Sequence, residues 1–316
     1  MGLKNLKYFG SLGFYLYYLL FKVYRYIKFD RLSDQEYISS RFLKTHGYPL
    51  DLDNPKTLNE KLQWLKLNDR RDLYTVHADK YGVRAYIQET FGDEYLVPMV
   101  LITDQISEVK PENLPNYPTI IKATHDSGSF RIVRDKHKVD WQKLRIDCKW
   151  WLSQNYYYAD REWQYQSIKP QIIIEKLLAT QDGFIPNDYK VNCFNGKVGF
   201  IYVSVDREGD NKRNIYDSSW NPLLFTWGAK YKDHSLMRGK EIEPPKTLSK
   251  MIEISESIAK NYAYVRVDFY DVDGHLYVGE ITHCHGGGFD VIRPIEWDYM
   301  LGEKLDLSQY GFKQKA

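Results

Sequence analysis

The sequence predicts an α+β fold in which helices alternate with antiparallel strand pairs. Two turn signals carry this prediction, because Asn195-Gly196 and Asp273-Gly274 each separate two segments that alternate between apolar and polar residues. The strands that flank these turns are expected at 188–194, 197–205, 264–271 and 275–281. Antiparallel hairpins mixed with helical segments are typical of α+β proteins rather than of parallel βαβ proteins.

Length and composition narrow the class of protein. The 316 residues leave room for two or three domains, and 43% hydrophobic with 16% aromatic residues is too apolar for a disordered chain. The 44 basic residues barely exceed the 42 acidic ones, which argues against nucleic acid as the main partner. The cysteines are odd in number and far apart, so we expect no disulfide framework and a reducing compartment.

Start and stop signals place the remaining elements. Thr57 and Glu60 form a capping-box pattern that opens a helix at 58–67, and a second helix is expected at 78–91, ending at Gly92. Further helices are expected at 141–154 and 246–262, and further strands at 119–122, 131–133 and 171–177. Residues 207–245 are expected to be rich in loops.

The first 30 residues predict a basic amphipathic helix. Their apolar run, 14–21, is too short to span a bilayer, and no small-residue cleavage site follows it. One polar stripe is expected along the helix, formed by Lys4, Lys7, Ser11, Tyr15, Tyr18, Lys22, Arg25 and Lys28. Two interpretations stay open: a helix that lies on an anionic membrane surface, or a helix that packs on its own protein or on another subunit.

Three segments carry weak signals of phosphate chemistry. Lys122 ends a short apolar strand and precedes a flexible loop with Ser127, Gly128 and Ser129, whose backbone N–H groups could approach phosphates. Lys80 and Arg84 share one face of the helix expected at 78–91. Glu175 lies near the end of the strand expected at 171–177. Taken singly, each has an ordinary structural alternative: a polar turn, a solvated helix face and a strand that leaves the core.

The segment from Tyr264 to Gly288 is the most informative. Asp268 and Glu280 lie on the two strands of one hairpin, with Thr282 two residues further on, and hard oxygen ligands of this kind suit Mg²⁺ held together with nucleotide phosphates. The competing interpretation is zinc bound by His283, Cys284 and His285. We disfavour zinc because neighbouring strand residues point to opposite faces and no second cluster has zinc spacing.

The register of that hairpin decides whether the acids meet. A two-residue turn would pair Val272 with His275 and place Asp268 and Glu280 on opposite faces. A three-residue loop would pair Val272 with Leu276, so that Asp268 opposes Glu280 and Arg266 opposes Thr282. We therefore predict the three-residue loop. The other face would then be apolar, formed by Val265, Val267, Phe269, Tyr277, Gly279 and Ile281.

These segments, in this order, resemble the ATP-grasp superfamily. The finer resemblance is to its TupA-like branch, named for teichuronopeptide biosynthesis, and rests on Asn54-Pro-Lys-Thr-Leu-Asn-Glu-Lys-Leu-Gln-Trp64 followed by Asp79-Lys-Tyr-Gly-Val-Arg84. The resemblance covers roughly residues 35–305 and implies a nucleotide held between two α+β subdomains. The amphipathic helix at 1–30 lies outside the resemblance, which implies an N-terminal α/β region at 31–117, a lid subdomain at 118–178 and a C-terminal subdomain with the metal site at 179–316.

The resemblance also implies roles for single residues. It assigns ATP contacts to Lys80, Lys122, Ser127, Gly128, Ser129, Glu175, Lys176, Leu177, Leu178 and Asp188. It assigns Mg²⁺ to Asp268, Glu280 and Thr282, where Thr282 replaces the usual asparagine and leaves metal binding through that position in doubt. It assigns catalysis to Arg266, which faces the reacting phosphate in D-alanine–D-alanine ligases, and to Lys190, the loosest match together with Asp188.

The activity that the resemblance implies is an ATP-dependent, ADP-forming carboxylate–amine ligase. The acceptor would be a carboxylated sugar such as a uronic acid in surface polysaccharide or capsule biosynthesis, and the donor an amino acid or another amine. Two alternatives remain: a phosphotransferase that acts on a sugar or polysaccharide, and a non-enzymatic assembly protein docked on the membrane. We expect a cytoplasmic protein at the inner face of the cell-envelope membrane, with ATP and Mg²⁺ as cofactors.

Overall fold

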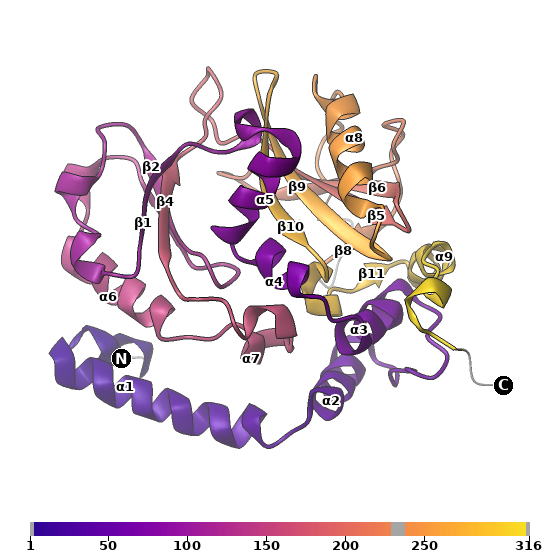
Figure 1. Ribbon diagram of the computed structural model, residues 1–316, viewed down its shortest axis with the longest axis horizontal. Coiled ribbons are helices and arrows are strands. Elements are labelled where there is room, and N and C mark those ends of the chain that lie inside the picture. The colour runs from indigo at the N-terminus through magenta and orange to yellow at the C-terminus, as the bar shows by residue number, and fades with distance from the viewer. Residues whose placement is uncertain (1–2, 229–237, 314–316) are drawn as a thin grey trace. The chain divides into compact units, whose positions relative to one another are not determined.

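The computed structural model describes residues 3–228 and 238–313 and is a mixed helix and sheet structure with antiparallel sheets, as the sequence predicts (Figure 1). Part of the segment expected to be rich in loops, residues 229–237, lies outside the described residues. The chain divides into two compact units, each built from separate stretches. Unit 1 comprises residues 1–38, 79–81 and 98–177, and unit 2 comprises 39–78, 82–97 and 178–316.

Unit 1 is built on a four-stranded antiparallel sheet with one covering helix. The strand order is β1-β4-β2-β3, with β1 Met99–Thr103, β4 Ile172–Lys176, β2 Thr119–Ala123 and β3 Phe130–Val133. Helix α6, Trp141–Leu152, begins where the Asp140 side chain accepts the Lys143 N–H at 2.9 Å. Its buried side chains, including Leu144 and Trp151, pack with isoleucines of β2 and β4 into one core.

The N-terminal helix packs on unit 1 through one of its faces. Helix α1 is Gly10–Arg25, preceded by the 3₁₀ helix Leu3–Tyr8 and followed by the π-helix Tyr26–Asp30. Tyr17 and Phe21 lie against Trp150 of α6 with ring centroids 4.6 and 5.1 Å apart, so the packing interpretation is confirmed for this face. Among the described residues, no helix is long and apolar enough to cross a membrane.

The polar stripe expected on this helix does not face solvent as a unit. Lys7 forms an ion pair with the buried carboxylate of Asp147 at 2.8 Å, and Arg25 stacks over the ring of Tyr158. The opposite side of the helix is apolar and exposed. Its members are Leu12, Leu16, Leu19, Leu20, Val23 and Ile27, each 40–82% exposed, and we call them the outward face of α1.

Unit 2 is built on a five-stranded antiparallel sheet and a smaller two-stranded sheet. The larger sheet has the order β10-β9-β5-β6-β7, with β10 His275–Thr282, β9 Tyr264–Val272, β5 Asp188–Phe194, β6 Lys197–Val205 and β7 Lys212–Tyr216. The smaller sheet pairs β8 Thr226–Trp227 with β11 Ile292–Arg293. The hairpin around Asn195-Gly196 is confirmed. Strand β7 was missed within the expected loop region, although it pairs with the preceding strand β6 across residues 206–211.

Helices bury the large core of unit 2. Helix α3, Leu58–Asn68, has the predicted capping box of Thr57 and Glu60, and its Leu58 and Leu62 are fully buried. Helix α8, Leu248–Ala259, covers β5 and β9 (Figure 1), and α9, Ile295–Lys304, packs on α3. The remaining helices are α2 Asp34–His46, which runs across the division between the units, and α4 Asp72–Ala78, α5 Gly82–Phe91 and, in unit 1, α7 Tyr157–Asp160.

The helix expected at 78–91 is present as α5, Gly82–Phe91, and ends before Gly92 as predicted, but it begins later than expected. The chain is not helical between α4 and α5, because Asp79 caps the Tyr81 N–H and the Lys80 N–H donates to the carbonyl of Thr124 at 3.1 Å. The expectation that Lys80 and Arg84 share one helix face is therefore wrong. Lys80 belongs to unit 1 by its contacts, whereas Arg84 lies in α5 of unit 2.

The β9–β10 hairpin reaches the predicted register by a different route. The turn has two residues, so Val272 pairs with His275 and the predicted three-residue loop is wrong. A β-bulge between Val278 and Glu280 supplies the missing residue, and beyond it Asp268 opposes Glu280 and Arg266 opposes Thr282, as predicted. Before the bulge, the two-residue turn places Tyr277 opposite Tyr270, so Val278 rather than Tyr277 joins the apolar face beside Phe269.

Gly279 makes this bulge possible. A Cβ atom at position 279 would meet Cε2 of the Tyr270 ring at 2.8 Å, closer than real Cβ atoms approach other heavy atoms. We therefore expect Gly279→Ala to lower the free energy of unfolding by about 1–3 kcal/mol, measured by chemical denaturation. In a Tyr270→Ala background the same change should cost less, because the ring that it meets is gone. An equal cost in both backgrounds would contradict this explanation of the bulge.

Candidate functional site

The sheet of unit 2 brings polar residues from three neighbouring strands into rows. Lys190 of β5 pairs with Asp268 of β9, which pairs with Glu280 of β10. The next row contains Asn192, Arg266 and Thr282. Paired residues and residues two apart share a face, so the sheet collects these side chains on one side. The structure thus brings together the predicted residues Lys190, Arg266, Asp268, Glu280 and Thr282.

Asp268 is the centre of this group. One of its oxygens, Oδ1, accepts from Nε of Arg266 at 2.6 Å, while Oδ2 accepts from Nη2 of Arg266 at 2.8 Å and from Nζ of Lys190 at 2.6 Å. Nζ of Lys190 also donates to Asp188 at 2.6 Å, and Nη2 of Arg266 lies 3.9 Å from Glu280. We call Asp188, Lys190, Arg266, Asp268 and Glu280 the charge cluster.

Mutual attraction keeps the buried members of the charge cluster ionised. Burial alone would lower the pKa of Lys190, but the carboxylates of Asp188 and Asp268 raise it above its ordinary value. Burial would likewise raise the pKa of Asp268, but Arg266 and Lys190 lower it. Burial opposes the charge of Arg266 as well, and Asp268 and Glu280 more than offset this, so its pKa is raised. Lys190 and Arg266 are therefore fixed cations, suited to neutralising negative charge and unsuited to accepting a proton.

A histidine that was not predicted for this role holds Arg266 from the other side. Nδ1 of His285 lies 3.0 Å from Nη1 of Arg266, and its Nε2 lies 3.3 Å from the Asp290 carboxylate. Burial lowers the pKa of His285, so the ring is neutral and accepts from Arg266 while donating to Asp290. The ring of Trp227 stacks on His285 at 3.9 Å. Sequence reasoning placed His285 only in the zinc alternative, and nothing in the sequence linked it to Trp227.

The histidines of the zinc alternative have different neighbours. His283 stacks on Tyr74 with ring centroids 3.8 Å apart and lies 2.9 Å from Nδ1 of His77, whereas His285 contacts Arg266. Burial, together with the neighbouring His77, holds the pKa of His283 well below its ordinary value. Within residues 3–228 and 238–313, no group of three or more His, Cys, Asp and Glu side chains is arranged to hold a metal ion by itself.

The arrangement nevertheless fits Mg²⁺ shared with a phosphate ligand. Magnesium is usually bound through one or two carboxylates, with phosphates and water completing its shell, so a cluster of three is not required. Glu280 is 29% exposed and hydrogen-bonded to Thr282, while Oδ1 of Asp188 is buried and accepts no hydrogen bond from the described residues. Within the charge cluster, three carboxylates (Asp188, Asp268 and Glu280) against two cations give a net charge of −1. Asp268 is engaged by two cations, so the more open oxygens are those of Glu280 and Asp188. Oδ1 of Asp268 accepts only one hydrogen bond from the described residues and keeps a second lone pair.

The triple glycine directly follows His285, the residue that contacts Arg266 of the charge cluster. Gly286, Gly287 and Gly288 have φ values of 54°, 60° and 72°, a left-handed turn that side chains rarely permit. Lys66 and Gln63 of α3 donate to the carbonyls of Gly287 and Gly288, at 2.7 Å each. A Cβ atom at Gly288 would meet Nε2 of Gln63 at 2.5 Å. The glycines therefore allow α3 to hold the turn that carries His285.

In unit 1, each of two predicted lysines makes a short contact with an oxygen atom. Nζ of Lys122 is 2.5 Å from Glu175, its diagonal neighbour across β2 and β4. Nζ of Lys80 donates to the carbonyl of Asp126, in the loop that follows β2. Unit 1 thus pairs Lys122 with Glu175 and ties Lys80 to the loop that follows the strand of Lys122.

The loop itself offers free donors. Ser127 and Gly128 are exposed, and Gly128 has a φ of +97° that favours glycine. Within the described residues, no hydrogen bond is made by the hydroxyl groups of Ser127 and Ser129. The predicted hinge is more constrained, because the N–H groups of Lys176 and Leu177 already donate to the carbonyls of Pro98 and Pro118. Leu177 is the last residue of unit 1, and Leu178 is the first residue of the following stretch of unit 2.

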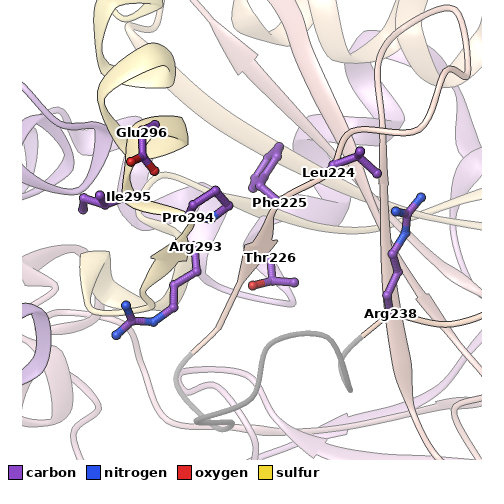
Figure 2. Close-up of a pocket in the computed structure, with 8 residues that line it drawn as sticks. All are labelled: Leu224, Phe225, Thr226, Arg238, Arg293, Pro294, Ile295 and Glu296. Carbon is purple, nitrogen blue, oxygen red and sulfur yellow. The ribbon is translucent and has the colours of Figure 1, made fainter.

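A pocket of about 660 Å³ opens in unit 2, beside the short sheet of β8 and β11. Figure 2 shows its lining: Leu224, Phe225 and Thr226 from the segment around β8, Arg238, and Arg293 to Glu296 from β11 and the start of α9. In this view Thr226 lies between the side chains of Arg238 and Arg293. The sequence carried no signal for this pocket, because its walls come from distant segments that meet through the β8–β11 pairing and the stacking of Phe225 on Trp297.

A comparison with models of known protein families identifies the family of this chain. The family model described as "TupA-like ATPgrasp" matches residues 60–306, most of the chain. The chain belongs to the TupA-like ATP-grasp family. Its charge cluster, Lys80 and Lys122 all lie within the matched residues. No curated protein matches this ATP-grasp chain.

Solved structures that resemble this ATP-grasp chain include several ligases. They include D-alanine–D-alanine ligase from Bacillus anthracis complexed with ATP (16% identity, 67% of this chain and 56% of that chain, TM-score 0.37). The ligase from Helicobacter pylori gives 16% identity over 78% and 69%, with a TM-score of 0.40. The ATP-grasp ligase PsnB, complexed with a precursor variant, Mg and ADP, gives 14% over 72% and 58%, with a TM-score of 0.38. The chain therefore matches little more than half of the first and last of these structures.

The charge cluster predicts a stability effect that is independent of any ligand. Asp268→Asn would leave Lys190 and Arg266 buried without their shared carboxylate, so we expect the free energy of unfolding to fall by roughly 3–5 kcal/mol in chemical denaturation. The exposed Asp182→Asn is the matched control and should change it by less than about 0.5 kcal/mol. A change as small as the control's in Asp268→Asn would show that Asp268 does not organise the cluster.

Proposed function

We propose that this chain is an ATP-dependent, ADP-forming ligase that joins a carboxylate to an amine through an acyl phosphate. The observation that carries the proposal is the charge cluster on β5, β9 and β10, where Arg266 and Lys190 are held as cations around Asp268 beside the more open carboxylate of Glu280. A family built on ATP chemistry supports the same assignment. Positioning and charge neutralisation are the main work of a phosphoryl-transfer site, and fixed cations supply both.

The nucleotide contacts that we propose in unit 1 rest on its lysines and its open loop. Lys80 and Lys122 would neutralise phosphate oxygens, and the exposed backbone at Ser127, Gly128 and Ser129 would donate to them. The hinge Glu175, Lys176, Leu177 and Leu178 would meet the adenine. Because the N–H groups of Lys176 and Leu177 are already used, the hinge would offer its carbonyl groups to the adenine amino group.

In unit 2 we propose that Glu280 and Asp268 hold Mg²⁺, with Asp188 and Thr282 next to it. The net negative charge of the cluster and the partly exposed carboxylate of Glu280 support this assignment, and the unpaired Oδ1 of Asp188 offers a further oxygen beside them. When bound, Mg²⁺ neutralises the phosphates of ATP and polarises the bond that breaks. Lys190 would keep Asp188 and Asp268 in place, and its fixed positive charge would add to this neutralisation.

The chemistry that we propose proceeds in two steps. The acceptor carboxylate attacks the γ-phosphorus, ADP leaves, and an acyl phosphate forms. The amine then attacks the acyl carbon, and phosphate leaves as the amide forms and the amine nitrogen loses a proton. Arg266 would face the transferred phosphoryl group in both steps, since Asp268 and His285 hold its guanidinium on two sides.

We propose a carboxylated sugar such as a uronic acid as the acceptor, and an amino acid or another amine as the donor, in surface polysaccharide or capsule biosynthesis. The resemblance to the TupA-like branch supports this substrate class. A phosphotransferase would use the same nucleotide and metal residues, so only the products separate the two activities. The intact charge cluster argues against a purely non-enzymatic assembly protein.

We also propose that α1 carries the chain to the inner face of the membrane. Its outward face exposes six apolar side chains, whereas the opposite side packs on Trp150. Lys4, Lys22 and Lys28 are exposed along the same segment, which contains no acid before Asp30. Exposed leucines bounded by lysines suit an interfacial helix on anionic lipid, where each lysine contributes about 1 kcal/mol.

Product analysis tests the proposed activity. With ATP, a panel of uronic-acid sugars and a panel of amino acids, we expect ADP, phosphate and a conjugate whose mass is that of the two substrates less one water. Glu280→Gln should lower kcat by about a hundredfold or more, because charge stabilisation at the phosphates is lost. Lys304→Gln, an exposed change on α9, should leave turnover unaltered. AMP and pyrophosphate, or a sugar that gains only phosphate, would contradict the ligase.

Liposome sedimentation tests the membrane proposal. Full-length protein should sediment with vesicles of phosphatidylcholine and phosphatidylglycerol at low salt, and the triple variant Leu12→Asp, Leu16→Asp and Val23→Asp should stay in the supernatant. Each burial of such a side chain contributes about 1.5–3 kcal/mol, and each new aspartate repels the anionic lipid. Leu43→Asp, a half-exposed leucine of α2, is the matched control. Equal sedimentation of both variants would contradict a role for the outward face.

A further inference from the structure

We propose that the pocket lined by Arg238, Arg293 and Glu296 is a binding site for the carboxylated saccharide acceptor, a site that takes sugar units next to the one that reacts. This inference rests on the proposed ligase function and names the substrate class of the same active site. Its volume of about 660 Å³ falls within the range of about 300–1,000 Å³ that is typical of small-molecule sites.

The charged side chains of the pocket favour an anion that also carries hydroxyl groups. Arg293 is exposed and forms no ion pair with the described residues, so its guanidinium is available for a carboxylate. Arg238 keeps a loose ion pair with Glu241 at 3.4 Å and adds a second positive charge. Glu296, exposed at the start of α9, offers acceptor oxygens for sugar hydroxyls.

The apolar part of the lining favours a sugar face over a small polar ion. Leu224 is 65% exposed and Ile295 is 38% exposed, so both present apolar surface inside an open pocket. Phe225, also in the lining, is buried, and its ring stacks on that of Trp297 with centroids 4.8 Å apart. This stacking fixes the orientation of the Phe225 ring in the lining. Carbon-bound hydrogens of a pyranose ring can cover such a surface while its carboxylate and hydroxyls meet Arg293 and Glu296 (Figure 2).

Direct contacts connect the pocket to Arg266. Thr226 and Arg293 of the lining are paired across β8 and β11, and the next residue, Trp227, stacks on His285. His285 in turn contacts Nη1 of Arg266 at 3.0 Å, and the indole N–H of Trp227 donates to the carbonyl of Asp290. The pocket and the charge cluster therefore adjoin the same buried layer. A saccharide held in the pocket could extend to the reacting centre, where its terminal carboxylate would be activated.

Size distinguishes the acceptor from the amine donor as the occupant. An amino acid would fill only a small part of about 660 Å³, and it would leave the exposed leucine and isoleucine uncovered. A chain of several sugar units matches both the volume and the apolar surface. The pocket thus predicts preference for an oligosaccharide over a single uronic acid.

Direct binding tests the inference without requiring turnover. The probe is the linear trimer of D-galacturonic acid, titrated into full-length protein by isothermal calorimetry, with the neutral trimer of galactose and a mixture of amino acids as comparisons. We expect the acidic trimer to bind and Arg293→Ala to weaken it by about ten- to a hundredfold, the range for loss of a charged hydrogen bond. Lys304→Gln, on the same unit but outside the pocket, should bind as the unaltered chain does. ATP binding, measured by thermal shift, should be the same in all three proteins.

The outcomes separate this inference from the proposed function. Galacturonate binding that depends on Arg293 supports the pocket even if no amide forms, and in that case only the ligase proposal fails. Equal affinity in Arg293→Ala, equal affinity for the galactose trimer, no binding of the acidic trimer, or displacement of the trimer by amino acids would each overturn the pocket assignment. Amide formation with an unchanged KM for the sugar in Arg293→Ala would overturn it while leaving the ligase in place.

Discussion

The carboxylate of Asp268 accepts three hydrogen bonds from two buried cations, and the polar face of the sheet in unit 2 is organised around it. Without it, Lys190 and Arg266 would be two like charges with little water to screen them. With it, each cation is fixed at a known position and reaches outward to a second partner, Asp188 in one case and His285 in the other. The neighbouring strand positions supply the other proposed metal-site residues, because residues of adjacent rows on β5, β9 and β10 share one face of the sheet.

That organisation depends on one extra residue in β10. The tight turn at Asp273-Gly274 alone would have turned Glu280 away from Asp268, and the bulge at Gly279 restores the alignment. Glycine has a similar role at Gly286 to Gly288. Their left-handed backbone conformation lets side chains of α3 donate hydrogen bonds to the turn that positions His285. Glycine thus serves the site twice, by permitting backbone shapes that place charged side chains rather than by contacting a ligand.

Local patterns in the sequence predicted much of this fold and part of the site. The capping box at Thr57 and the hairpin at Asn195-Gly196 follow from short-range rules and hold in the structure. The pairing of Asp268 with Glu280 also holds, but through a β-bulge rather than through the predicted three-residue loop. The break at Asp79–Tyr81 could not be foreseen, because the Lys80 N–H bonds to Thr124, far away in the sequence. For the same reason, the contacts of Trp227 and His285 with Arg266, and the pocket beside β8, arise only when distant segments meet. The helix at 1–30 has both a packed and an exposed apolar face, and a single polar stripe could not describe both.

The central claim is that Arg266 and its cluster activate a carboxylate by transferring phosphate to it. The most direct test follows the transfer of ¹⁸O from the acceptor carboxylate to the released phosphate. The reaction contains a uronic-acid acceptor labelled with ¹⁸O in its carboxylate, unlabelled ATP and an amine. If an acyl phosphate forms, one labelled oxygen leaves the acceptor with each phosphate released, and mass spectrometry of the phosphate will detect it. Unlabelled phosphate released together with amide, or a phosphorylated sugar that keeps both labelled carboxylate oxygens, would contradict the account.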